Sequence, residues 1–319
     1  MYKELKVNKL KFFKTFFVLI FIIFLSALLL TACIATDAGD NTAGKLQIVA
    51  TLFPQYDFTK QIAGDKANVK LLLPPGTESH GYDPKPSDML GIYNADLFIY
   101  TGKNMEPWAE IIIKSVKNNN LTIVDCSKNM EVLCVGDRCE HEHGADAHIW
   151  LDPTKAIQMV ENILEALCQK DPENTDFYMQ NAEDYIKRLQ KLDDDVFDVL
   201  KNAKRNFIVF GGRFSYIYFL RHFNLDYTTV YDSCSTNTEP SISKIISVIE
   251  FIRQNNIPCI YYEELSDPKA AKLIAKETKT EYLQFSTAHN VTKNEFEEGI
   301  TFLDIMYVNL ENLKKGLNE

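Results

Sequence analysis

The sequence predicts an α/β protein in which two α/β lobes are joined by one long rigid helix. Short β-rich runs alternate with helical patterns in both halves of the chain, which is typical of sheets covered by helices. Between the halves, apolar residues recur every three or four positions from Glu173 to Asn202, without a glycine or proline. Because a single rigid helix limits how far two lobes can close, we expect a cleft between them.

Each lobe is predicted to contain four strands. In the first half the β-rich runs cover 46–51, 68–73, 96–102 and 121–125, and the helical patterns cover 54–63, 87–94 and 106–117. In the second half the β-rich runs cover 207–210, 226–231, 259–264 and 281–285, and the helical patterns cover 213–221, 241–255, 268–278 and 293–317. The boundaries therefore place the N-terminal lobe at 46–172, the linking helix at 173–204 and the C-terminal lobe at 205–319.

The N-terminus has the features of a lipoprotein signal peptide. Lysines precede an apolar stretch from Phe16 to Leu30, which is too short for a comfortable membrane span. Residues 30–33 read Leu-Thr-Ala-Cys and resemble the bacterial lipobox, in which the cysteine is lipidated and becomes the mature N-terminus. We expect a signal peptide at 1–32, a flexible tether at 33–45 and a mature protein outside the cytoplasm, anchored to the membrane through Cys33. The alternative is a membrane helix with an incidental cysteine.

Composition and missing motifs argue against several classes of function. A formal charge of −10 argues against nucleic acid as a partner. The chain contains no G-x-S-x-G elbow, no H-E-x-x-H helix and no Walker phosphate loop. The cysteines after Cys33 are too sparsely spaced for a disulfide scaffold, although Cys134 and Cys139 are close enough to bridge a small loop.

Three histidines lie where the predicted cleft would open. His80 occurs in PPGTESHGYDPKPSDM, where prolines on both sides stiffen the loop. His148 precedes the helix start at Asp152-Pro153, and His289 follows the last predicted strand. Ligands of open α/β sheets bind at the carboxyl ends of strands, and three converging imidazoles form a zinc-like ligand set. The alternative is that each histidine is a satisfied core or surface residue.

Other donors could complete this site or form a second one. Glu263 and Glu264 end a predicted strand, so either carboxylate could face the cleft. His141 and His143 lie in CVGDRCEHEHGAD, which is interpreted either as a metal-scavenging loop or as a solvated polar loop.

These segments resemble the metal-binding, lipid-anchored receptors of zinc and manganese ABC importers, the TroA-like cluster. TLFPQYDFTKQIAGD is similar to the family's opening strand and helix, LLPPGTESHGYDPKPSD to its first ligand loop and HIWLDP to its second. The long helix and the ending EEGITFLDIMYVNLENLKKGL also fit, so the resemblance covers nearly the whole mature chain. It implies two α/β lobes with metal held between them, and it places His80 and His148 on the metal.

Two ligand positions depart from the family's pattern. The usual third ligand is the histidine of H-x-x-F-x-Y, whereas GGRFSY places Gly211 there. The usual fourth ligand, an aspartate before the last helix, falls near TAHNV, where His289 is the obvious donor. We therefore expect His289 to restore a three-histidine site, completed by Glu264, Glu263 or water.

Imidazole-rich sites favour Zn²⁺ over Mn²⁺, which prefers added carboxylates. We expect a monomeric binding protein that captures Zn²⁺ outside the membrane and delivers it to an ABC-type permease, without breaking a bond. The alternatives are a receptor of the same type for manganese or another divalent metal, an extracellular zinc hydrolase with Glu264 as base, and an adhesin.

Overall fold

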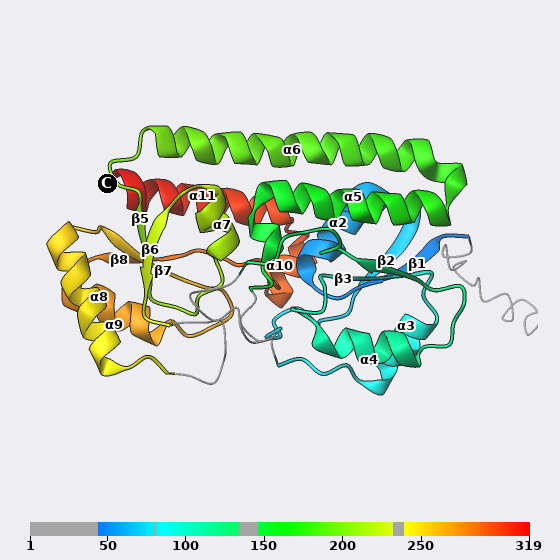
Figure 1. Ribbon diagram of the computed structural model, residues 1–319, viewed down its shortest axis with the longest axis horizontal. Coiled ribbons are helices and arrows are strands. Elements are labelled where there is room, and N and C mark those ends of the chain that lie inside the picture. Colours follow the sequence, from blue (N-terminus) through cyan, green and yellow to red (C-terminus); the bar gives the residue numbers. More distant parts are fainter. Residues whose placement is uncertain (1–43, 80, 134–145, 232–238) are drawn as a thin grey trace, which may run out of the picture. The chain divides into compact units, whose positions relative to one another are not determined.

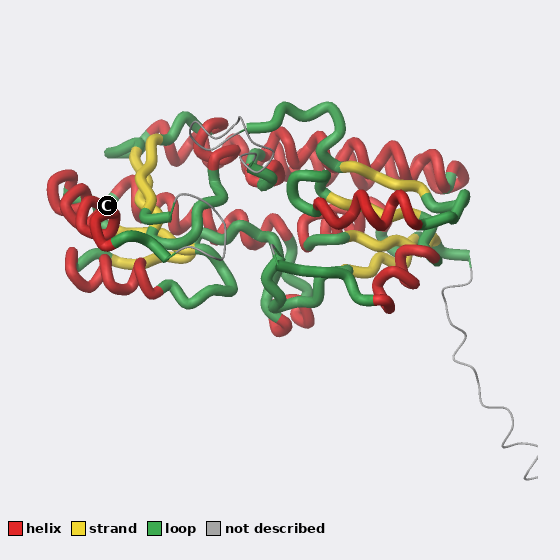
Figure 2. The backbone as a smooth tube through the Cα atoms, turned by 60° about the horizontal axis from the view of Figure 1, so that its bottom comes forward, coloured by secondary structure: helices red, strands yellow, loops and turns green. Residues whose placement is uncertain are grey.

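The computed structural model describes residues 44–79, 81–133, 146–231 and 239–319. Leu46–Glu319 forms one compact unit, and only residues 44 and 45 of the unit before it are described. The compact unit contains two four-stranded parallel sheets, each with its own helices (Figures 1 and 2). This arrangement confirms the predicted α/β lobes.

The first sheet has the strand order β2-β1-β3-β4. Ile48 of β1 pairs in parallel with Val69 of β2 and with Leu97 of β3. All residues of β3 are buried, as expected for a parallel strand covered on both faces. The elements of this lobe are β1 (Leu46–Ala50), α2 (Phe53–Ala63), β2 (Ala67–Leu71), α3 (Pro86–Tyr93), β3 (Leu97–Tyr100), α4 (Pro107–Ser115), β4 (Thr122–Asp125), η2 (Ile149–Leu151) and α5 (Pro153–Lys170).

The second sheet repeats this pattern with the order β6-β5-β7-β8. In each sheet the strand order therefore reverses beside the lobe's first strand, between β1 and β3 and between β5 and β7, where open α/β sheets bind ligands. The elements of the second lobe are β5 (Phe207–Phe210), α7 (Ile217–His222), β6 (Asp226–Thr229), α8 (Ile242–Asn255), β7 (Cys259–Tyr262), α9 (Lys269–Thr278), β8 (Glu281–Gln284), α10 (Lys293–Glu298) and α11 (Phe302–Asn318).

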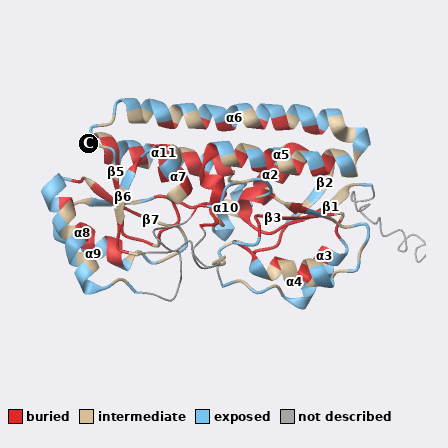
Figure 3. Cartoon of the chain, in the orientation of Figure 1, coloured by how far each residue is buried: buried red, intermediate tan, exposed pale blue. Residues whose placement is uncertain are grey.

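One long helix joins the lobes, as the apolar periodicity predicts. A short turn, η3 (Pro172–Asn174), leads into α6 (Thr175–Lys201), whose 27 residues span about 40 Å. Helix α6 packs against α2 and α5 of the first lobe and against α11 of the second (Figure 1). Its inward face is buried and its outward face exposed (Figure 3), and the buried residues are Tyr178, Ala182, Tyr185, Leu189, Leu192 and Val196.

Two predicted helices differ from the structure. The helix expected over 293–317 is two helices, because α10 ends at Gly299 in the left-handed region (φ 79°) and α11 restarts with a capping box at Thr301. The helix expected from 213 begins only at Ile217. The rings of Phe214 and Tyr216 both pack on Phe210, so the residues before Ile217 form a loop instead of a helical turn. The linking helix, expected to end at 204, ends at Lys201. The other predicted helix and strand boundaries lie within two residues of those observed.

A buried carboxylate, Glu106, fills the point where the first sheet reverses its strand order. It accepts hydrogen bonds from Thr51 Oγ1 (2.5 Å) and from the N–H groups of Thr101 and Gly102 (3.2 Å each). Burial raises the pKa of Glu106 to about 7, although these hydrogen bonds oppose the rise. Glu106 thus ties the turn after β1 to the turn after β3.

We expect the free energy of unfolding of the wild-type protein to depend on pH through Glu106, and the Glu106→Gln variant to lose this dependence. The pKa of Glu106 is about 7 in the folded chain against an ordinary value of 4.5, so the folded state binds this proton more tightly. The resulting stabilisation is complete below pH 4.5 and is lost as the pH rises through 7; it amounts to on the order of 3 kcal/mol. Urea unfolding at several pH values measures this difference. Equal pH dependence in the two proteins would contradict the prediction.

Candidate metal centre

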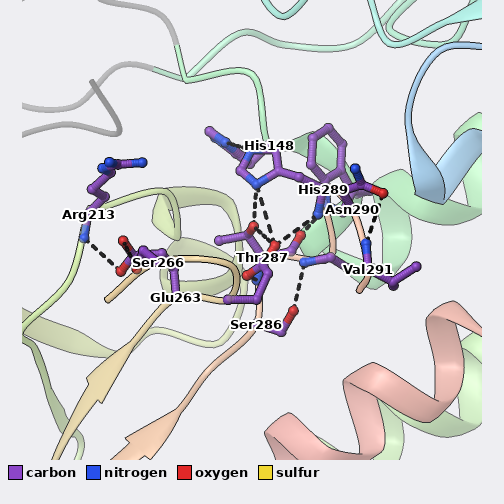
Figure 4. A network of polar contacts seen from close by, with 12 residues as sticks. His148, Arg213, Glu263, Ser266, Ser286, Thr287, His289, Asn290 and Val291 are labelled. Carbon is purple, nitrogen blue, oxygen red and sulfur yellow. Dashed lines mark hydrogen bonds and ion pairs between the residues drawn. The ribbon is translucent and has the colours of Figure 1, made fainter. Parts of the chain in front are cut away.

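Two of the predicted ligand histidines meet in the structure. His148, just before η2, and His289, in the loop after β8, face each other with their Nε2 atoms 2.5 Å apart (Figure 4). Only 1 % of His148 and 12 % of the His289 side chain are exposed. Two imidazoles on a tetrahedral zinc ion hold their nitrogens about 3.3 Å apart. The pair therefore needs to separate by less than about 1 Å to accept the ion.

A buried carboxylate orients the His148 ring. Asp146 Oδ1 lies 2.6 Å from His148 Nδ1 and accepts the His148 backbone N–H at 2.8 Å. Burial raises the pKa of Asp146, but the charge of His148 and these hydrogen bonds outweigh it, so the net pKa is lowered. Asp146 is therefore an acceptor for Nδ1–H, which leaves the His148 Nε2 lone pair for a metal. Carboxylate–histidine pairs of this kind support metal sites.

A second set of hydrogen bonds orients the His289 ring. Its Nδ1 atom contacts Thr287 Oγ1, which in turn donates to Glu264 Oε1 at 2.6 Å. Glu264 also accepts the backbone N–H groups of Thr287 (2.6 Å) and His289 (3.2 Å). Burial raises the pKa of Glu264, yet the bonds from His289 and Thr287 give a net lowering. Glu264 therefore lies on the Nδ1 side of His289, away from the nitrogen that faces His148.

The electrostatics keep His289 available as a ligand. Burial lowers the pKa of His289, and the nearby charge of His148 lowers it further, while Glu264 opposes the change. Because metals bind the neutral imidazole, a lowered pKa reduces competition from protons.

The loop that carries His289 is fastened to the first lobe. Trp150 Nε1 donates to Thr287 O (2.7 Å), and the Phe53 N–H donates to His289 O (3.1 Å). Asn290 is the next residue, and its Nδ2 donates to the carbonyls of Pro74 (2.8 Å) and Thr77 (2.9 Å). The loop before position 80 and the loop around His289 are thus held together directly.

A cavity of about 40 Å³ lies beside His289, and three carboxylate side chains, those of Glu78, Glu263 and Glu264, line it. Glu263 accepts the Arg213 N–H at Oε2 (2.9 Å) and the Ser266 hydroxyl at Oε1 (2.8 Å). Burial raises the pKa of Glu263. The cavity is large enough for a single ion or a water molecule.

The structure explains why no side chain replaces the missing histidine at position 211. A Cβ on Gly211 would lie 2.7 Å from Ile260 Cδ1 and 2.8 Å from the Ala271 backbone. A Cβ on Gly212 would lie 1.7 Å from Glu263 Oε2. Close packing against the Ala271 backbone therefore restricts position 211 to glycine, whereas a side chain at position 212 would require the Glu263 carboxylate to move.

Several predicted residues lie outside the described residues: His80, His141, His143, Cys33, Cys134 and Cys139. Within the described ranges, no group of three or more histidine, cysteine, aspartate or glutamate side chains is arranged to hold a metal. His222 is separate from the site and pairs with Asp193 at 2.6 Å. The part of the chain that the structure describes therefore contributes the facing pair His148 and His289.

The sequence analysis did not identify the residues that support the two imidazoles. Asp146 had a local signal, because it stands two residues before His148. Thr287 likewise stands two residues before His289. Trp150 had no local signal, since its contact with Thr287 joins segments that are distant in sequence.

The sequence and the fold agree with those of a known family. The model for "ZnuA: Zinc-uptake complex component A periplasmic" matches residues 48–316. The chain belongs to this family. It is 33 % identical to the high-affinity zinc uptake system protein ZnuA of Bacillus subtilis, over 93 % of this chain and 97 % of that protein. It is 32 % identical to the zinc-binding lipoprotein AdcA of Streptococcus pneumoniae, over 92 % of this chain but only 60 % of AdcA.

A solved structure of the ZnuA family shares the architecture. The Zn(II)-bound ZnuA-like domain of Streptococcus pneumoniae AdcA superposes with a TM-score of 0.75 at 31 % identity, covering 86 % of this chain and all of that domain. The ZnuA-type arrangement of two parallel-sheet lobes and a long helix is therefore the fold of this chain.

Removal of the Asp146 carboxylate is expected to weaken zinc binding. In Asp146→Ala the His148 ring loses the acceptor that fixes its orientation, and loss of such partners costs about 10- to 100-fold in metal affinity. Competition titration with a zinc indicator measures the effect. Asp83→Ala, which removes an exposed carboxylate, serves as the control. Equal affinities in the two variants would show that Asp146 does not orient the ligand.

Adding a methyl group at position 211 is expected to destabilise the fold. Gly211→Ala forces the Cβ against Ile260 and Ala271, and such overpacking costs about 1–3 kcal/mol. Denaturant unfolding measures the loss. The control is Gly91→Ala in helix α3, where the added Cβ meets only Lys70 Nζ at 3.8 Å. Because alanine also has a higher helix propensity than glycine, we expect the stability of this variant to be unchanged or increased. A Gly211→Ala variant as stable as wild type would refute the packing argument.

Proposed function

We propose that this protein captures Zn²⁺ outside the cytoplasmic membrane and delivers it to an ABC-type permease. The observation that carries the proposal is the facing pair of His148 and His289, whose Nε2 atoms converge while their Nδ1 atoms are held by other groups. Membership of the zinc-uptake family and the zinc-binding relatives support it. Zinc is the cargo, and no covalent bond changes.

The proposed ligands are the imidazoles of His80, His148 and His289. Three neutral imidazoles favour Zn²⁺ over Mn²⁺. Glu264 and Glu263, predicted as candidates for the fourth position, both line the cavity, but their oxygens accept hydrogen bonds from the surrounding protein. These contacts favour a supporting role for both, with Glu264 orienting His289.

Binding and release follow from the acid–base properties of the ligands. Zinc requires the lone pair of each Nε2, so any proton on either Nε2 must leave when the ion enters. The Asp146 and Thr287 contacts hold both rings during this exchange. Delivery then requires separation of the imidazoles, which a small displacement of the His289 loop would produce.

The location and partners are part of the proposal. We infer that lipidated Cys33 anchors a monomer to the membrane and that the segment with His141 and His143 scavenges metal. The lipoprotein name of the AdcA relative supports the anchor. Among the described residues, no helix is long and apolar enough to cross a bilayer.

Loss of one imidazole tests the proposed function. His289→Ala removes one of the two converging nitrogens, so zinc affinity is expected to fall by about 100-fold or more. Calorimetric titration of the metal-stripped protein with Zn²⁺ and with Mn²⁺ measures this, with His222→Ala as a control for loss of a histidine away from the site. Tight zinc binding that His289→Ala does not weaken would refute the ligand assignment. A wild-type protein that binds no zinc would refute the function.

A further inference from the structure

His148 stands between two hydrogen bonds that join its segment to the second lobe. Two residues after it, Trp150 Nε1 donates to Thr287 O at 2.7 Å. Two residues before it, the carbonyl of Asp146 accepts the hydroxyl of Tyr218, a residue of α7, at 3.2 Å. Helix α7 also packs against η2, which begins directly after His148. The position of this imidazole therefore depends on contacts across the lobe boundary on both sides of it.

The Tyr218 hydroxyl lies between two chain segments of the first lobe. It accepts the Leu133 N–H at 3.0 Å and donates to Asp146 O, with Glu131 O as a second acceptor at 3.4 Å. The Asp146 N–H in turn donates to Leu133 O at 2.8 Å. Because Tyr218 bonds to both Leu133 and Asp146, it fixes the two segments in one position relative to α7.

The surroundings of Tyr218 keep its ring in place and its hydroxyl protonated. The residue is buried, and Lys155 Nζ of α5 lies 5.8 Å from the centre of the ring. Burial raises the pKa of Tyr218 to about 12, although the bond from the Leu133 N–H opposes the rise. The hydroxyl therefore remains a hydrogen-bond donor to Asp146 near neutral pH.

Asp146 connects this hydroxyl to the imidazole. Its Oδ1 atom lies 2.6 Å from His148 Nδ1 and accepts the His148 backbone N–H. Within the described ranges, its other hydrogen bonds go to Leu133 and Tyr218. The carboxylate can orient the ring only as far as its own backbone is fixed, and of these partners Tyr218 alone belongs to the second lobe.

We propose that Tyr218 is a positioning residue of the zinc site, which places Asp146, and through it the His148 ring, from the opposite lobe. This inference rests on the proposed function. The support is reciprocal, because Trp150 of the first lobe fixes the loop of His289, while Tyr218 of the second lobe fixes the carboxylate that orients His148. Even a small displacement between the lobes therefore loosens both imidazoles at once, which favours release of the ion.

The experiment compares Tyr218→Phe with Tyr178→Phe. Each variant loses one hydroxyl from a buried ring, but the Tyr178 hydroxyl donates to Asp171 at the far end of α5. Proton resonances of the metal-free full chain report the Nδ1–H of His148, and this signal is identified by its loss in Asp146→Ala. Zinc affinity is measured by indicator competition on the metal-stripped chain. Phenylalanine keeps the packing of the ring, and thermal unfolding confirms that both variants are folded.

We expect Tyr218→Phe to shift or broaden the His148 Nδ1–H signal and to bind zinc about 10-fold more weakly than Tyr178→Phe. An unchanged signal would overturn the positioning role, whatever the affinity. A changed signal with zinc affinities within about threefold of each other would overturn the link between Tyr218 and metal binding. A wild-type protein that binds no zinc would instead overturn the proposed function, and the Nδ1–H signal would still decide whether Tyr218 positions the ring.

Discussion

The geometry of the metal centre depends on hydrogen bonds that cross from the first lobe to the loop after β8. Trp150, Phe53 and Gly76 all belong to the first lobe, and each donates to a backbone carbonyl within 287–291. Because the backbone carbonyls of the loop accept these bonds, the path of the loop does not depend on its own side chains. The imidazole of the loop therefore faces His148 before any metal arrives. Such preorganisation reduces the ordering cost of binding.

The same restraint extends through the helices that join the lobes. Asp57 of α2 accepts the Phe302 N–H (3.0 Å) at the start of α11 and the Tyr185 hydroxyl (3.2 Å) of α6. Burial raises the pKa of Asp57, because removal from water disfavours the charged form of this carboxyl group. Three helices from both lobes meet at one side chain. This junction opposes a wide hinge motion, which agrees with a site that needs only a small separation of two rings.

Much of the fold could be predicted because apolar periodicity determines it directly. The burial of Tyr178, Tyr185 and Leu192 on one face of α6 follows from their spacing alone. The break between α10 and α11 was missed because the apolar pattern continues through Gly299, although the capping residues were visible in the sequence. His148 could be placed at the site because it stands in a loop at the edge of a lobe.

The supporting residues of the site could not be predicted in the same way. The contact of Thr287 with His289 Nδ1 depends on a turn whose shape is set by Trp150 and Phe53, far away in sequence. The sequence shows that glycine replaces the usual histidine at position 211, but it does not show the reason for this replacement. Only the packing shows that Ala271 occupies the space that a side chain would need.

The position of the site between the lobes also has a physical reason. In open α/β sheets the crevice where the strand order reverses is the usual ligand site. Here a carboxylate of the protein fills each crevice: Glu106 accepts hydrogen bonds from the turns after β1 and β3, and Glu263 lies over Gly212 after β5. Each carboxylate thus occupies part of its crevice, and the cavity beside His289 adjoins the crevice of the second sheet. In the part of the chain that the structure describes, the two facing imidazoles, His148 and His289, lie on loops that meet between the lobes.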